Sequence, residues 1–361
     1  MKYSRWAVLA TVCGLALSSG AGTAHAAVPE AAASSAAQEP AAPLDLPDGF
    51  GLTQVPTEPE IVEQNTPTDF VITHTTPQVA GRHHLRIVLP DDYYTAPEKG
   101  YPVLYLLHGS PGDPASYFDD YEGVTYSDAI NGESGMIIVM PDGGQRSWYS
   151  DWLDQNTAAG AQNWETFHIE QIIPFIDANL RTIPTKDKRA IAGISMGGFG
   201  AFHYAQRHPE LFSQVAALSG DLDFGRDQMV MREVVVASLV AAYEPRVHSD
   251  ALWGSPYPAF DDHLWNEADP NQNAAAMRGM DISIYIGNGG IPVLDWDLME
   301  FWLHSSSVNM KNALEAENIP VNWYDYGAGA NWGDCNGGHN GRCWSESLRH
   351  LVPHIKEEFG V

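Results

Sequence analysis

The sequence of 361 residues has few cysteines, few basic residues and no long apolar run. Its three cysteines argue against a disulfide-rich scaffold and against a thiolate zinc site. Its 19 Lys and Arg residues stand against 46 Asp and Glu residues, for a formal net charge of −27. A surface this acidic repels nucleic acid and anionic lipid head groups. We therefore expect no nucleic-acid partner.

The N-terminus predicts export. Lys2 and Arg5 supply the positive charge at its start, and Trp6 to Leu17 follow as an apolar run too short for a membrane span. Ala24-His25-Ala26 then match a signal-peptide cleavage site. Residues 1–26 are thus expected to be a signal peptide, and the mature chain to be secreted, extracellular or in the cell envelope, without a stable membrane anchor. Loss of two basic residues takes the charge from −27 to −29. Residues 27–60, rich in Ala, Pro and Ser, are expected to form a disordered linker, and residues 61–361 the catalytic domain.

Only Cys335 and Cys343 remain once Cys13 is removed with the signal. Two cysteines eight positions apart in an exported chain are expected to form one disulfide. No cysteine is then left to act as a nucleophile.

Apolar runs alternate with helical periods along the rest of the chain, which predicts a doubly wound, mostly parallel sheet. An apolar helical insert is expected over Met229 to Ala242, after the helix that follows Ser195. Pro174, inside a helical period, predicts a kink or a late helix start. The expected strands are Phe70–Thr73, His84–Leu89, Val103–Leu107, Met136–Met140, Arg189–Ile194, Val215–Leu218, Ile282–Ile286 and Val321–Tyr324, and the expected helices are Trp164–Leu180, Met196–Gln206, Leu298–Glu317 and Trp344–Glu358.

Ser195 lies between Gly193 and Gly197, after an apolar strand and before a helix. This is the pattern of a nucleophile elbow, in which a sharp turn lifts a serine hydroxyl above the strand end. Side chains at the two glycine positions would collide with the neighbouring strand and helix. The pattern predicts that Ser195 is a catalytic nucleophile.

A serine nucleophile requires a base and an acid, which in this arrangement follow the serine in the order acid, then histidine. His339 fits as the base because it lies in a glycine-rich loop after the last expected strand, a loop that the Cys335–Cys343 disulfide would close. The acid should follow the strand that ends near Ile286. The spacing leaves three candidates open, namely Asp295, Asp297 and Glu300.

The oxyanion of an acyl-transfer reaction needs two N–H donors. We expect one from Met196, directly after the nucleophile, and one from Ser110, in the loop after the strand that ends at Leu107. Trp148 is a candidate for lining the alcohol side of the site.

Several blocks in chain order resemble the esterase D and antigen 85 branch of the α/β hydrolases, which includes mycolyltransferases. The resemblance covers about residues 80–350. The blocks are Val103 to Gly109, Ile138 to Gln145, Ser147 to Trp152, Asn163 to Phe167, Gly193 to Gly198, Leu252 to Gly254, Asp269-Pro270, Ile286 to Gly289 and Leu298 to Phe301.

This resemblance implies an α/β-hydrolase fold, a Ser–His–Glu triad with Glu300 as the acid ahead of Asp297, and no cofactor or metal. It also points to His108 and Trp344 as substrate-binding positions. The chain departs from mycolyltransferases where these hold trehalose, since His108 and Pro111 replace their acidic residue and arginine. The family's histidine slot holds Arg342, two residues before Trp344.

The sequence thus predicts a secreted serine esterase that cleaves small-molecule or lipid acyl esters through an acyl-enzyme and passes the acyl group to water or to an acceptor hydroxyl. One alternative is a mycolyltransferase-type acyltransferase acting on cell-envelope glycolipids. A second is a non-catalytic secreted binding protein. A third is a metal-dependent hydrolase that uses Asp261, Asp262 and His263.

Overall fold

A computed structural model of the protein describes residues 44–114, 128–225, 228–291 and 297–361. The expected signal peptide, most of the expected linker and the candidate acid Asp295 lie outside these residues. Within the described ranges, every helix is too short or too polar to cross a membrane.

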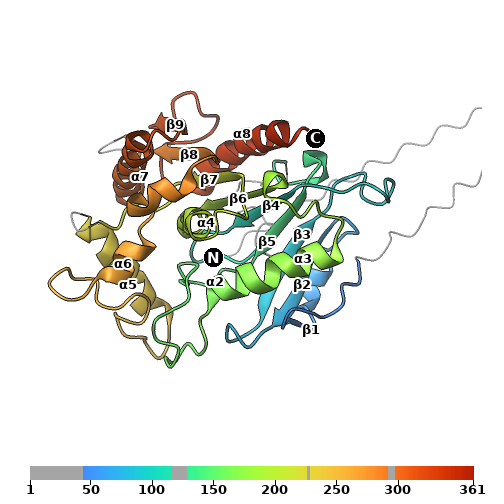
Figure 1. The fold of residues 1–361 in the computed structure, drawn as a ribbon, viewed down its shortest axis with the longest axis horizontal. Coiled ribbons are helices and arrows are strands. Elements are labelled where there is room, and N and C mark those ends of the chain that lie inside the picture. The colour runs from blue at the N-terminus through green and yellow to red at the C-terminus, as the bar shows by residue number, and fades with distance from the viewer. Residues whose placement is uncertain (1–43, 115–127, 226–227, 292–296) are drawn as a thin grey trace, which may run out of the picture. The chain divides into compact units, whose positions relative to one another are not determined.

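The described residues form one mixed sheet whose larger part is parallel (Figure 1). Its strands are β1 (Thr53–Val55), β2 (Asp69–Thr75), β3 (His83–Val88), β4 (Val103–Leu107), β5 (Ile137–Pro141), β6 (Arg189–Ile194), β7 (Gln214–Leu218), β8 (Asp281–Gly287) and β9 (Asn322–Gly327). They lie in the order β1-β2-β3-β5-β4-β6-β7-β8-β9. Strands β1, β2, β3 and β5 pair antiparallel, and the pairs from β5 to β9 are parallel. The predicted doubly wound, mostly parallel sheet is confirmed.

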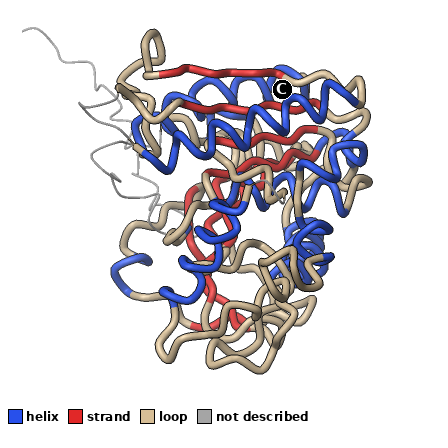
Figure 2. The backbone as a smooth tube through the Cα atoms, turned by 90° about the vertical axis from the view of Figure 1, so that its left-hand side faces the viewer, coloured by secondary structure: helices blue, strands red, loops and turns tan. Residues whose placement is uncertain are grey.

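Helices cover both faces of this sheet (Figure 2). They are α1 (Pro59–Val62), α2 (Trp164–Thr166), α3 (Ile173–Asn179), α4 (Met196–Arg207), α5 (Met229–Ala242), α6 (His263–Ala268), α7 (Leu298–Ala316) and α8 (Gly341–Phe359). Alternate residues of each central strand point to opposite faces. Tyr105 and Leu107 of β4 therefore join the core that contains α3, α4 and α7, whereas Leu104 and Leu106 join the core under α8.

Pro174 alters the helix that contains it, as the sequence predicted. A helical run extends from α2 to α3, but Phe167–Ile172 between them adopts π-helical geometry. Pro174 lies in the first turn of α3, a position at which a residue without a backbone N–H is tolerated.

The folded domain begins before residue 61, contrary to the expected linker boundary. Residues 44–60 include β1, which pairs with β2, and the start of α1. Leu46 and Leu52 are 3% and 2% exposed and belong to the main core. Burial of each such side chain is worth about 1.5–3 kcal/mol, which contributes to holding this segment on the sheet.

Candidate active site

Ser195 occupies the turn between β6 and α4, at the carboxyl end of a central parallel strand. Its φ of 56° is a strained backbone conformation for a residue with a side chain. A Cβ atom at Gly193 would overlap Gly197 O, and one at Gly197 would overlap Leu107 O. Only glycine fits at positions 193 and 197, two residues before and after the serine, as expected for a nucleophile elbow.

The three predicted triad residues form a continuous chain of hydrogen bonds. Ser195 Oγ lies 2.8 Å from His339 Nε2, and His339 Nδ1 lies 2.8 Å from Glu300 Oε2. An ionised carboxylate only accepts, so Nδ1 carries the imidazole proton and Nε2 is free to accept from the serine hydroxyl. This is the arrangement that acyl transfer by a serine nucleophile requires.

Glu300 is fully buried and its carboxylate is held from two sides. Its Oε1 accepts hydrogen bonds from Ser219 Oγ at 2.8 Å and from Gly287 N at 2.9 Å. With His339 on Oε2, three donors compensate for the loss of hydration that burial imposes on a charge.

Asp297, the other described acid candidate, lies one helical turn from Glu300 and faces the backbone instead of the imidazole. Its Oδ1 caps α7 by accepting from Met299 N at 2.9 Å and Glu300 N at 3.2 Å. Its Oδ2 accepts from His339 N at 2.8 Å. Asp297 thus joins the helix that carries Glu300 to the loop that carries His339.

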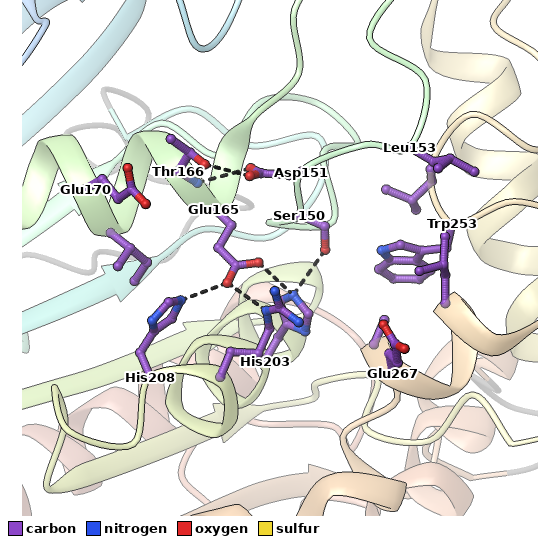
Figure 3. A pocket seen from close by; sticks show the side chains of 15 residues that line it. Ser150, Asp151, Leu153, Glu165, Thr166, Glu170, His203, His208, Trp253 and Glu267 are labelled. Atoms are coloured by element: carbon purple, nitrogen blue, oxygen red, sulfur yellow. Dashed lines mark hydrogen bonds and ion pairs between the residues drawn. The ribbon is translucent and has the colours of Figure 1, made fainter.

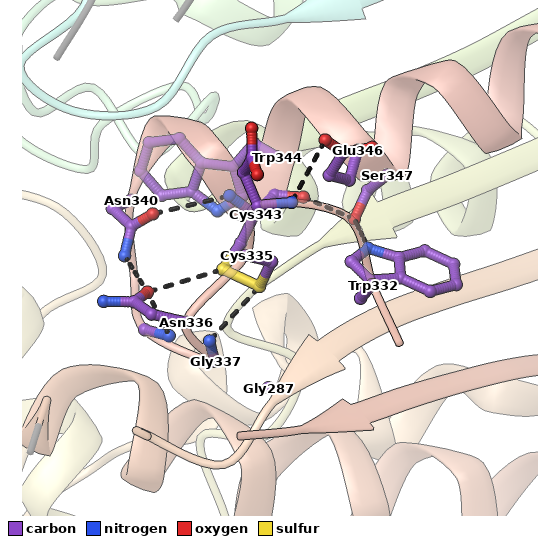
Figure 4. Close-up of a disulfide and its surroundings, with 12 residues drawn as sticks. Gly287, Trp332, Cys335, Asn336, Gly337, Asn340, Cys343, Trp344, Glu346 and Ser347 are labelled. Carbon is purple, nitrogen blue, oxygen red and sulfur yellow. Dashed lines mark hydrogen bonds between the residues drawn. A yellow bond between two sulfur atoms is a disulfide. The ribbon is translucent and has the colours of Figure 1, made fainter. Parts of the chain in front are cut away.

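A disulfide closes the loop that carries His339 (Figure 4). Cys335 and Cys343 are bonded, as the sequence predicted, and the cysteines are 7% and 0% exposed. Inside the ring, Asn340 Nδ2 donates to Asn336 Oδ1 at 2.7 Å, and Asn340 Oδ1 caps α8. These bonds restrict the freedom of a glycine-rich segment.

Ser219 and Trp344 support the triad from behind. Trp344 lies edge-on to the His339 ring, with 4.9 Å between ring centroids, and its Nε1 donates to Ser219 Oγ at 3.2 Å. Sequence reasoning missed Ser219. Its position directly after β7, next to the strand that carries Ser195, was the available signal, because site residues gather at the carboxyl ends of parallel strands.

A cavity of about 570 Å³ opens beside Ser195. The loop of residues 108–113, the segment around Asp142, and Ile194, His339 and Trp344 line it. Trp344 therefore lies where a substrate-binding residue was expected.

His108 also lies in the cavity wall, but both of its ring nitrogens are already bonded. Nε2 accepts from Gly143 N at 2.7 Å, so Nδ1 carries the proton and donates to Gly109 O at 2.7 Å. The ring is 2% exposed and holds two loops together. The structure thus gives His108 a structural contact rather than a free polar group for substrate.

Met196 and the turn that contains Ser110, the two expected sources of oxyanion donors, both lie next to Ser195. Met196 is the first residue of α4, so its N–H has no intrahelical acceptor. The turn around Gly109 packs against Ser195 so closely that a Cβ atom at Gly109 would lie 3.1 Å from Ser195 Cβ. Ser110 follows in this turn and its Oγ donates to Gln145 O.

One expectation about the substrate pocket differs from the structure. Trp148 is absent from the described cavity wall. Its side chain is 6% exposed and packs edge-on against Phe199 and Phe224. The positive φ of Trp148, 51°, turns the ring into the core. The insert α5 forms as expected, but none of its residues lines the described cavity. Its buried face, which includes Val235 and Leu239, extends the core.

A second cavity of about 380 Å³ shares no described lining residue with the first (Figure 3). Glu165 forms its floor and accepts from Arg207 Nε at 2.7 Å and His208 Nε2 at 2.8 Å. His203 Nε2 lies 3.5 Å from Glu165 and 3.4 Å from Ser150 Oγ. One nitrogen faces both groups, so this serine, histidine and glutamate cannot relay a proton as a triad.

The carboxylates of the alternative metal cluster diverge. Asp262 is buried and pairs with Arg232 Nη1 at 2.8 Å, whereas Asp261 pairs with His263 at the surface. The residues described by the structure contain no set of three or more His, Cys, Asp or Glu side chains arranged to hold a metal ion.

Comparisons with known proteins agree with this geometry. The family model described as "Putative esterase" matches residues 76–355. Esterase Rv1288 of Mycobacterium tuberculosis is 41% identical over 180 residues, which are 50% of this chain and 37% of that protein. The diacylglycerol acyltransferase/mycolyltransferase Ag85B of Mycobacterium intracellulare is 26% identical over 298 residues, 76% of this chain and 84% of that protein.

Among solved structures, MPT51 (FbpC1) of Mycobacterium tuberculosis superposes with a TM-score of 0.59 at 19% identity, over 79% of this chain and 96% of that one. At such low identity the superposition speaks for a shared α/β-hydrolase fold. The first curated relatives are matched over little more than a third of their length. The family match over most of the described domain shows that the chain belongs to the esterase family of α/β hydrolases, in the branch of esterases and acyltransferases that includes antigen 85.

Proposed function

We propose that the protein is an exported serine esterase that cleaves carboxylic esters through an acyl-enzyme on Ser195. The observation that carries this proposal is the unbroken chain of hydrogen bonds from Ser195 through His339 to Glu300 at the edge of an open cavity. The predicted signal peptide and the disulfide are consistent with export.

In the proposed mechanism, His339 takes the proton of Ser195 as Oγ attacks the ester carbonyl. The N–H groups of Met196 and Ser110 stabilise the tetrahedral oxyanion, and each such donor is commonly worth about 2.7–4 kcal/mol of barrier. His339 then protonates the leaving alcohol. Water, or another hydroxyl in the same place, attacks the acyl-enzyme and regenerates Ser195. Glu300 keeps the imidazole in the required tautomer and stabilises its charged form.

Labelling with a fluorophosphonate probe tests the nucleophile. We expect wild-type protein to be labelled and to release p-nitrophenol from p-nitrophenyl acyl esters, and Ser195→Ala protein to do neither. Ser150→Ala is the matched control, because Ser150 is the serine beside His203 in the second cavity. Labelling that survives in Ser195→Ala protein would refute the proposal by showing that another residue is the reactive nucleophile. A folded wild type without label would also refute it and would favour the binding-protein alternative.

The acyltransferase alternative rests on the similarity to Ag85B over most of both chains. The natural acceptor is tested by supplying a sugar or glycerol with the p-nitrophenyl ester and looking for acylated acceptor. Free acid as the sole product supports the esterase. Acylated acceptor formed in preference to free acid supports the transferase.

A further inference from the structure

His84 of β3 lies outside the triad, yet it connects the N-terminal segment to the loop beside Ser195. Its Nδ1 is 2.9 Å from both carboxylate oxygens of Asp113, and its Nε2 is 3.1 Å from Glu58 Oε2. A neutral imidazole has a single N–H, so one ring nitrogen would then face a carboxylate with a lone pair. The geometry therefore requires the doubly protonated imidazolium.

Asp113 lies three residues after Ser110, in the loop that supplies the proposed oxyanion donor. The loop is fixed at its start, where Tyr149 OH donates to His108 O at 2.8 Å, and in its middle, where Ser110 Oγ donates to Gln145 O. It turns so tightly that a Cβ atom at Gly112 would overlap Gly109 O. The bond between Asp113 and His84 fixes a third point of this loop.

We propose that His84 is a positioning residue for the oxyanion loop: its imidazolium, shared between Glu58 and Asp113, holds the loop so that Ser110 N–H points at the reacting carbonyl. The proposal rests on the proposed function. It also gives the segment that the sequence suggested was a linker a role in catalysis, because Glu58 directly precedes α1.

The charges around His84 predict a dependence on pH. The hydrogen bond to Asp113 raises the pKa of His84; burial opposes this, and the charge of Asp113 and the contact with Glu58 reinforce it, so the pKa rises to about 9. Arg82, 3.1 Å from Glu58 Oε1, completes the described cluster. Among the residue types in this cluster, histidine is the one that ordinarily titrates nearest neutral pH. The positioning effect of His84 is complete below its ordinary pKa of 6.5 and is lost as pH rises through about 9.

The test compares pH profiles of kcat and KM from pH 6 to 10 for wild type and His84→Gln, after subtraction of spontaneous ester hydrolysis. Glutamine can still donate to Asp113 but carries no charge and does not titrate. We expect kcat at pH 7 to fall about 10-fold with KM within twofold, since one weakened loop contact is worth roughly one tenfold step. We also expect the alkaline decline near pH 9 to disappear.

Glu58→Gln is the second variant, because Glu58 is absent from the described cavity wall. With one carboxylate removed, the pKa of His84 should fall, so the alkaline decline should move to lower pH. His248→Gln, which breaks an exposed pair with Asp154, should leave the profile unchanged. An NMR titration should assign the proton lost near pH 9 to His84.

An identical alkaline decline in folded His84→Gln protein, or a His84 that titrates near 6.5, would overturn the proposal. If His84→Gln protein does not fold, the direction of the shift in Glu58→Gln protein decides. Failure of the proposed function is recognised separately, because it appears as labelling that survives in Ser195→Ala protein or as a folded wild type that is neither labelled nor active.

Discussion

Comparing the loss of kcat in Glu300→Gln protein with that in Asp297→Asn protein tests which of two neighbouring carboxylates orients His339. Both changes keep the size of the side chain and remove one charge. In Glu300→Gln protein the group facing His339 Nδ1 can no longer act as an anion, so the imidazolium that forms during catalysis loses its partner. In Asp297→Asn protein the two N–H groups of α7 retain their oxygen acceptor, and the new NH₂ group faces His339 N–H.

The two losses differ in size. Replacing the triad acid by its amide costs about 10⁴-fold in kcat in a serine protease, or about 5.5 kcal/mol. Loss of one hydrogen bond to a charged group costs about 1.5–3 kcal/mol, so Asp297→Asn should reduce kcat by roughly 10- to 150-fold. KM should change little in either variant, because neither group contacts the substrate.

Hydrolysis of a p-nitrophenyl ester measures both effects, and thermal unfolding shows whether the variants fold. Asp154→Asn is the matched control. Like Glu300, Asp154 accepts hydrogen bonds from a backbone N–H, that of Asn156, and from a histidine ring, that of His248. Asp154 lies outside the described wall of the cavity. It should retain kcat within about twofold. A larger loss in Asp297→Asn than in Glu300→Gln would reverse the roles of the two carboxylates and refute this reasoning.

Two further predictions concern the disulfide and a buried carboxylate. Replacing Cys335 and Cys343 by serine should lower the free energy of unfolding, measured with denaturant, by about 2.5 kcal/mol, the chain-entropy value for a ring of this length. The same change should lower kcat for ester hydrolysis because it loosens the loop that carries His339. Full activity of the double variant would contradict this second expectation. Asp221 is 2% exposed, and its Oδ2 has no hydrogen-bond partner among the residues that the structure describes. Burial, with Asp223 and Asp269 nearby, raises the pKa of Asp221. An acid whose pKa is raised in the folded state lowers the free energy of unfolding as pH rises above its unfolded pKa, because only the unfolded chain then loses the proton. Asp221→Asn should therefore gain about 1 kcal/mol or more over wild type between pH 4.5 and pH 8, and a gain that does not grow with pH would argue against a raised pKa of Asp221.

Local patterns in the sequence were sufficient to predict the central strands and the elbow. Runs such as Val103–Leu107 are apolar at every position, and each became a buried parallel strand with the expected bounds or within two or three residues of them. The glycines around Ser195 predicted a turn because the steric requirement is local. By contrast, β1 has three residues and owes its strand geometry to pairing with β2, which no local pattern reveals.

The side-chain assignments were harder, because they depend on directions that only the folded chain defines. Asp297 and Glu300 are three residues apart on one helix start, and spacing could not tell which one faces the imidazole. Trp148 was expected near substrate, but the positive φ at that position turns its ring into the core. The hydrogen bonds of His84 to Asp113 and Glu58 were not predicted either. Glu58 and His84 belong to different elements and meet only when β3 and the N-terminal segment pack together.

The ring between Cys335 and Cys343 makes the oxidation state of the surroundings a component of the catalytic machinery. Ser195 and Glu300 sit on elements that the core of the domain fixes, whereas the imidazole depends on a covalent bond that folding alone does not make. A chain that has folded with both thiols reduced would hold its nucleophile and its acid in place and leave the base poorly aligned. Ester cleavage would then be slow until the disulfide forms, so that full activity would follow transfer to an oxidising compartment.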